Sequence, residues 1–141
     1  MNFLLDSNIV SEWTKPRPNE RVAAWLAEAD EDRIFLSVIT LAELRRGVQR
    51  LPAGARRDRL DAWLTDQLKP RFEGRILPID AETADVWGRL ITHGQAAGRP
   101  VSTMDGFLAA TAQQHDLTLV TRNTADFDIL GIRLINPWHP S

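Results

Sequence analysis

Four acidic residues are placed where a carboxylate could take part in chemistry. Asp6 directly follows a short apolar run, and Asp126 lies just past another. Glu43 is flanked by leucine and alanine, and Asp105 opens a stretch of small residues. Taken singly, each acid also has a structural explanation as a cap, a turn residue or a solvated surface charge. Taken together, they suggest a shared site.

Carboxylates held close together repel one another, and a divalent cation removes that repulsion. The set offers only oxygen donors, and the chain has no cysteine. Such a set favours a hard ion, Mg²⁺ or Mn²⁺. These ions activate water and stabilise a leaving oxygen on phosphate esters. The pattern therefore predicts hydrolysis without a side-chain nucleophile, in keeping with the lack of a Gly-x-Ser-x-Gly motif.

The acids can converge only if the strands before them are neighbours in one sheet. Short apolar runs predict five strands, at Asn2–Leu5, Ile34–Ser37, Arg75–Ile79, Leu117–Thr121 and Ile132–Ile135. The third of these is expected near a sheet edge, because Pro78 has no N–H to donate.

Helical periodicity fills the intervals between the strands. The predicted helices run from Ser7 or Asn8, as the cap, through Glu12, and then over residues 19–29, 39–51, 55–68, 81–97 and 104–115. Asn19 and Thr103 are the expected caps of two helices, and Gly98 the expected stop of another. This alternation predicts a single α/β domain over residues 1–141. Its parallel sheet should have four to five strands, helices on both faces, and a site beyond the strands' carboxyl ends.

Charge and composition narrow the function classes. The net charge of −2 argues against a generic basic nucleic-acid binder, and no apolar run is long enough to span a membrane. The lack of cysteine fits a cytoplasmic location. The densest basic stretch follows Glu43 and begins with Arg45, Arg46 and Arg50. It is interpreted as a solvated helix face, an RNA track, or a landing site for an acidic partner.

The chain resembles the PIN-domain ribonucleases, specifically the VapC or FitB type of toxin from bacterial toxin–antitoxin pairs. The resemblance rests on an ordered set of segments that spans almost the whole chain. They are L-L-D-S-N-I-V-S-E, S-V-I-T-L-A-E-L-R-R-G, R-I-L-P-I-D, M-D-G-F-L-A-A-T-A-Q-Q-H, V-T-R-N-T-A-D-F and the late N-P-W-H.

The resemblance assigns roles to individual positions. Asp6, Glu43 and Asp105 match the three acids that hold Mg²⁺ or Mn²⁺ in this family. The family's fourth position is here the neutral Asn123, and a further acid, Asp126, follows three residues later. Which of the two supplies the fourth ligand is left open. Thr121, and Ser7 with it, match positions that support the site.

The resemblance also implies an activity and partners. It implies metal-dependent hydrolysis of RNA, tRNA among the substrates, that stops translation. It implies a homodimer inhibited by a cognate antitoxin of the VapB or FitA kind, in a heterotetramer or larger complex. Contact with DNA would then be indirect, through the antitoxin, and no membrane would be involved.

Two other interpretations compete with this one. The L-L-D-S-N segment after a first strand also resembles phosphatases and receiver domains that use a nucleophilic aspartate. Those proteins need a lysine after a late strand, whereas Lys15 and Lys69 are the only lysines here. The second alternative is a non-catalytic PIN-like module that binds RNA or protein without cutting.

Overall fold

A five-stranded, wholly parallel sheet forms the centre of the protein, in the order β3-β2-β1-β4-β5. The structure is a computed structural model, and it describes residues 1–139. The strands are β1 (Phe3–Leu5), β2 (Ile34–Ser37), β3 (Ile76–Leu77), β4 (Thr118–Val120) and β5 (Leu134–Ile135). The α/β fold predicted from the sequence is confirmed, with five strands. That one domain occupies the full range 1–141 stays a prediction, since its last two positions lie outside the described residues.

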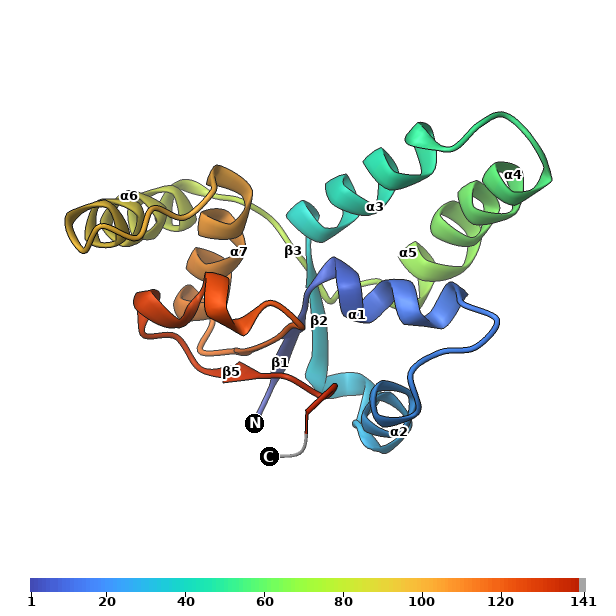
Figure 1. Cartoon of the computed structure of the whole chain (residues 1–141), viewed down its shortest axis with the longest axis horizontal. Helices are drawn as coiled ribbons and strands as arrows, with labels where there is room; N and C mark the ends of the chain where they lie inside the picture. The colour runs from blue at the N-terminus through green and yellow to red at the C-terminus, as the bar shows by residue number, and fades with distance from the viewer. Residues whose placement is uncertain (140–141) are drawn as a thin grey trace.

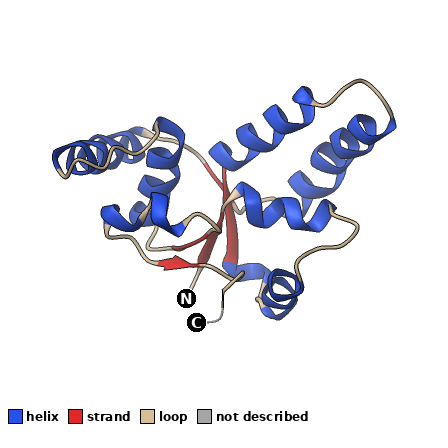
Figure 2. Ribbon diagram, viewed as in Figure 1, coloured by secondary structure: helices blue, strands red, loops and turns tan. Residues whose placement is uncertain are grey.

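Helices cover both faces of the sheet, as Figures 1 and 2 show, with α6 and α7 on one side and α1, α3 and α4 on the other. The helices are α1 (Ser7–Ser11), α2 (Glu20–Glu28), α3 (Val38–Arg50), α4 (Ala55–Ala62), α5 (Lys69–Arg71), α6 (Ala81–Ala96) and α7 (Thr103–Gln114). A π-helical segment spans Trp63–Leu68, and 3₁₀ turns span Glu12–Thr14, Glu31–Arg33, Thr124–Asp126 and Asp128–Leu130.

The sheet separates two apolar cores because successive side chains of a strand point to opposite faces. Leu5 and Val120 pack into the core beneath α1, α2 and α3. Leu4 and Leu119 pack into the core beneath α6 and α7. All four of these residues have no exposed surface. This double burial explains why the strands read as continuous apolar runs rather than as alternating patterns.

The central strand β1 lies at the point where the strand order reverses. It pairs with β2 on one side, Phe3 opposite Ile34, and with β4 on the other, Leu5 opposite Val120. The connections that follow the two strands at such a point lead to opposite faces of the sheet, so a crevice forms beyond the carboxyl ends of these strands. The segments after β1, β2 and β4 therefore meet at one edge.

Two predicted helix caps are wrong. The first helix is capped by Asp6, whose carboxylate accepts the Ser7 N–H, rather than by Ser7 or Asn8. Helix α7 is capped by Ser102, whose hydroxyl accepts the Asp105 N–H, rather than by Thr103. In both cases the cap lies one or two residues earlier, where the backbone is still extended. The predicted Asn19 cap and the predicted stop at Gly98, whose φ is 72°, are confirmed.

Several predicted element boundaries also differ by a few residues. The fourth strand covers Thr118–Val120 instead of Leu117–Thr121, and the fifth covers Leu134–Ile135 instead of Ile132–Ile135. The third strand covers only Ile76–Leu77 instead of Arg75–Ile79, because Pro78 cannot continue the ladder. Its edge position is confirmed. The helix expected to stop at residue 68 continues to Arg71, and it accommodates Pro70 after a π-helical turn. The carboxyl ends of β1 and β2 lie at Leu5 and Ser37, as predicted, and that of β4 moves by one residue, from Thr121 to Val120.

No helix within residues 1–139 is long and apolar enough to cross a membrane.

Helices α6 and α7 approach closely at Gly106, the residue after Asp105. A Cβ added at Gly106 would lie 2.6 Å from Ile91 Cδ1 and 2.8 Å from Trp87 Nε1. The Trp87 indole also donates to the Thr103 carbonyl at 3.2 Å and stacks on Phe107, with ring centroids 5.1 Å apart. Because Gly106 has no side chain, the first turn of α7 can lie directly against α6.

The Gly106→Ala variant should be less stable than the parent protein by about 1–3 kcal/mol, because the added methyl must displace a packed indole. Urea unfolding measures this difference. Gly88→Ala, in the same helix pair, is the matched control, since a Cβ added at Gly88 would meet nothing within 4 Å. The control should gain about 0.5–1 kcal/mol. Equal effects of the two substitutions would contradict the close approach at Gly106.

Candidate functional site

Asp6 is held at the carboxyl end of β1 by contacts to both carboxylate oxygens. The Ser7 N–H donates to Oδ1 at 2.7 Å, and the Thr121 hydroxyl donates to Oδ2 at 2.7 Å. Only 5% of the residue is exposed. Burial raises the pKa of Asp6, against the lowering effect of these hydrogen bonds, and the nearby charge of Asp126 raises it further. The side chain is therefore fixed in orientation and sensitive to added negative charge.

The Thr121 hydroxyl lies at the centre of a small polar network. It accepts the Asn123 N–H at 3.0 Å and the Asn8 side-chain amide at 3.4 Å. The Asn8 side-chain oxygen Oδ1 in turn accepts the Arg122 backbone N–H at 3.3 Å. These bonds tie the chain after β1 to the chain after β4. Thr121 was expected to support the site from its sequence position, whereas Asn8 was expected only as a possible helix cap, and its role in this network was not predicted.

Glu43 projects from the second turn of α3 and is half-buried. Burial raises its pKa to about 7, and the negative charges of Asp6 and Asp105 add to the rise, while Arg46 opposes it. The base of α3 is fixed by the Thr40 hydroxyl, which donates to the Leu5 carbonyl at 3.1 Å. Glu43 therefore shares the electrostatic environment of the β1 end.

Asp105 lies in the first turn of α7, after the Ser102 cap. Burial raises its pKa, the charges of Asp6 and Asp126 raise it further, and the Ser102 hydroxyl partly offsets the rise. The sequence pattern Ser102-Thr103-Met104-Asp105 carries the signature of a capping box. That signature was the available signal for Ser102, which the sequence analysis passed over.

Asp126 and Asn123 both lie on the exposed segment after β4. The Asp126 N–H donates to the Asn123 carbonyl at 3.0 Å and closes the 3₁₀ turn. The charge of Asp126 reaches both Asp6 and Asp105, as their pKa values show. For Asn123, the described contacts involve its backbone only. Asp126 is thus electrostatically linked to the other acids.

The donor set fits a hard cation in its chemistry. All of its side-chain donors are oxygens, and negative charge on Asp6, Glu43 and Asp105 is disfavoured together, which a cation would relieve. Within residues 1–139, no three acidic or histidine side chains already stand close enough to hold one ion. The assignment of these residues as metal ligands therefore stays a prediction.

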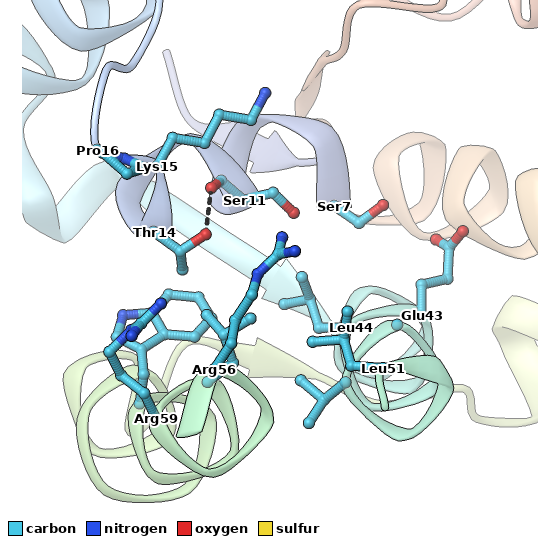
Figure 3. A pocket seen from close by; sticks show the side chains of 14 residues that line it. Ser7, Ser11, Thr14, Lys15, Pro16, Glu43, Leu44, Leu51, Arg56 and Arg59 are labelled. Carbon is cyan, nitrogen blue, oxygen red and sulfur yellow. Dashed lines mark hydrogen bonds between the residues drawn. The ribbon is translucent and has the colours of Figure 1, made fainter. Parts of the chain in front are cut away.

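A groove of about 550 Å³ runs from Glu43 between α1, α3 and α4. Its lining is largely apolar and includes Leu44, Leu51, Leu60 and Trp63. Figure 3 shows Glu43 at one end, near Ser7, and Arg56 and Arg59 along the opposite side. The groove thus joins an apolar surface and basic side chains to one of the acids.

The arginines singled out in α3 differ in their surroundings. Arg45 donates to Asp61 at 2.7 Å and to Thr65 at 3.2 Å, so it links α3 to the next helical segment. The charge of Arg46 acts on Glu43. Arg50 is exposed at the end of α3. Contact of these three residues with RNA or a partner remains a prediction, and among the three the charge of Arg46 acts on Glu43.

Comparison with known proteins gives a consistent result. The family model described as PIN domain matches residues 3–131. Toxin FitB of Neisseria gonorrhoeae is 42% identical over 137 residues, which cover 97% of this chain and 99% of that protein. VapC ribonuclease Y4jK of Sinorhizobium fredii is 36% identical over 139 residues, which cover 99% of each chain.

A solved structure is equally similar in fold. The structure of FitAB bound to IR36 DNA fragment contains a chain that superposes with a TM-score of 0.93 at 39% identity. The match covers 99% of this chain and 97% of that one.

The raised pKa of Glu43 predicts a pH-dependent stability for the metal-free protein. A carboxyl whose folded pKa exceeds its unfolded value binds its proton more tightly when folded, so its contribution is destabilising once it ionises. The free energy of unfolding should therefore fall between about pH 4.5 and pH 7. Glu43→Gln should flatten this fall and raise the unfolding midpoint at pH 8, as measured by urea unfolding in a chelator. Glu28→Gln, on the exposed face of α2, should leave the profile unchanged. A Glu43→Gln profile as steep as that of the parent would disprove the raised pKa.

Proposed function

The chain belongs to the PIN domain family, in its VapC and FitB toxin branch, and we propose on this basis that it is a metal-dependent ribonuclease. It would hydrolyse phosphodiester bonds of RNA, with tRNA as a candidate substrate, and so stop translation in the cytoplasm. The observation that supports this proposal most directly is the electrostatic coupling of Asp6, Glu43 and Asp105 at the carboxyl edge of the sheet.

Asp6, Glu43, Asp105 and Asp126 would hold the cation, Mg²⁺ or Mn²⁺, with Asn123 as the alternative fourth ligand. When bound, the ion supplies an activated water and stabilises the leaving oxygen of the phosphodiester. The surrounding residues orient the ligands. Ser7 and Thr121 hold both oxygens of Asp6. Metal ligands act in their deprotonated form, so Glu43, with its pKa of about 7, must release its proton to serve.

The RNA backbone would approach along the arginines that follow Glu43. Arg46 and Arg50 lie on the exposed surface of α3, on the same helix as Glu43. Arginine binds phosphate oxygens through its planar fork. The overall charge of −2 makes this a local rather than a general attraction.

A cognate antitoxin would occupy the groove between α1, α3 and α4. The groove combines an apolar floor with Arg56 and Arg59, which suits a segment that carries both apolar and acidic side chains. Because the groove ends at Glu43, an antitoxin segment bound in it would lie against the proposed metal site. The solved structure of FitAB bound to a DNA fragment supports an assembly that contains an antitoxin and reaches DNA. The family resemblance suggests that this assembly pairs a homodimer of this chain with antitoxin, in a heterotetramer or larger, and that the antitoxin makes the contact with DNA.

Removing one acid tests the proposed cleavage. Asp105→Asn should lower RNA cleavage by at least about a hundredfold while leaving the protein as stable as the parent or more so, because it removes repulsion. The measurement is a cleavage assay on total RNA, with urea unfolding alongside. Asp85→Asn, an exposed acid of α6 paired with Arg89, is the control and should retain activity.

The metal requirement is tested in the same assay. A chelator should stop cleavage by the parent protein, and Mg²⁺ or Mn²⁺ should restore it, whereas Ca²⁺ should not, because of its looser geometry. A parent protein that binds RNA but does not cut it under any of these ions would favour the non-catalytic alternative. Cleavage by Asp105→Asn at the parental rate would exclude the ligand role of Asp105.

The antitoxin groove is tested by reversing charge. Arg56→Glu combined with Arg59→Glu should weaken binding of the antitoxin at least about tenfold, through lost attraction and added repulsion. Calorimetry with the purified antitoxin measures the affinity. Arg21→Glu, on the exposed surface of α2, is the control and should bind as the parent does. Unchanged affinity of the double variant would place the antitoxin on another surface.

A further inference from the structure

A second cavity, of about 350 Å³, lies between the chain that leads into α7 and the segment after β4. Its lining includes Asp105 and Asp126, and Arg99 completes the wall between the segments that carry them. These segments are far apart in the chain, because one opens α7 and the other follows β4. Arg99 is neither a proposed metal ligand nor a residue of the groove.

One nitrogen of the Arg99 guanidinium donates two hydrogen bonds to the segment that carries Asp126. Its Nη2 donates to the Ala125 carbonyl at 2.9 Å and to Asp128 Oδ1 at 2.6 Å. The two acceptors stand immediately before Asp126 and two residues after it. The turn is therefore held on both sides of the acid by a single charged group.

The backbone of Arg99 is itself fixed. Its N–H donates to the Gly94 carbonyl at 2.9 Å, after the turn that Gly98 makes with a φ of 72°. The chain is close-packed there, since a Cβ added at Gly94 would lie 3.0 Å from the Arg99 carbonyl oxygen. Three residues later, Ser102 caps α7 and fixes the turn that carries Asp105. Arg99 thus connects the fixed chain before α7, which leads to Asp105, to the segment that carries Asp126.

We propose that Arg99 is a positioning residue that holds Asp126 opposite Asp105 through its bonds to Ala125 and Asp128. This inference rests on the proposed function, in which the two acids bind one cation. Asp105 and Asp126 line the same cavity, so their like charges repel each other when no cation lies between them. A tether between their segments opposes this repulsion and keeps the donors ready for the ion.

The proposal predicts an effect on metal affinity with little effect on folding. Both members of the Arg99–Asp128 pair are about half exposed, at 49% and 54% of their side-chain surface. Exposed ion pairs add little to stability. Groups that orient metal ligands, by contrast, change metal affinity about ten- to hundredfold when removed.

Arg133 provides a matched control at the other end of the strands, their amino ends. Its Nη2 donates to the Asp116 carbonyl at 2.8 Å and to Asp116 Oδ1 at 2.7 Å, so it repeats the pattern of one carbonyl and one carboxylate. Its side chain is 54% exposed, close to that of Arg99. It precedes β5, at the amino ends of the strands, away from the acids.

The experiment compares Arg99→Ala, Arg99→Lys and Arg133→Ala with the parent protein. Calorimetric titration with Mn²⁺ alone measures metal affinity, and urea unfolding of the metal-free proteins measures stability. Arg99→Ala should bind Mn²⁺ about ten- to hundredfold more weakly than the parent. Arg99→Lys should recover part of that loss, because a lysine keeps the charge facing Asp128. The unfolding midpoints of Arg99→Ala and Arg133→Ala should shift equally little, and Arg133→Ala should keep parental affinity.

The outcomes separate this inference from the proposed function. Parental Mn²⁺ affinity in Arg99→Ala would overturn the positioning role while leaving the ribonuclease proposal intact. An equal loss of affinity in Arg133→Ala would also overturn it, since the effect would then be general. A parent protein that binds no Mn²⁺ would instead overturn the proposed metal site, and the role of Arg99 with it.

Discussion

The hydrogen bond from the Thr121 hydroxyl to the Asp6 carboxylate joins the ends of the two strands at the centre of the sheet, and the arrangement of the other acids depends on it. Asp6 is almost wholly buried, so its charge would be costly without donors aimed at both oxygens. The hydroxyl that bonds Asp6 also accepts from Asn8 and Asn123. One buried contact therefore sets both the orientation of the central acid and the path of the chain after β4.

Around this contact, the two helical layers bring further negative charge toward Asp6 from opposite faces of the sheet. Helix α3 brings Glu43 and α7 brings Asp105, each anchored at its base by a hydroxyl, that of Thr40 or of Ser102. Close approach of α7 to α6 at Gly106 completes the placement. Packing interactions thus hold together charges that repel, an arrangement typical of sites built for function rather than for stability.

Much of the fold could be predicted because its signals are local. Apolar runs marked the strands, the proline at residue 78 marked an edge, and the strand–helix alternation required a parallel sheet. The boundaries were less predictable, because neighbouring residues of capping type compete and the backbone conformation decides between them. Asp6 and Ser102 took roles assigned to their neighbours for that reason. Pro70 likewise sits within a helical stretch that its residue type alone would have ended.

For the site, residue order was enough to show which side-chain types are available and that the acids after β1 and β4 lie at one end of the sheet, since parallel strands end together. The surroundings of each acid follow from the folded arrangement instead. The pKa of about 7 at Glu43 arises from burial and from charges distant in the chain. The hydrogen bond of Asn8 to Thr121 and those of Arg99 to the turn of Asp126 likewise join segments distant in the chain. Such effects depend on distances between segments, which residue order does not specify.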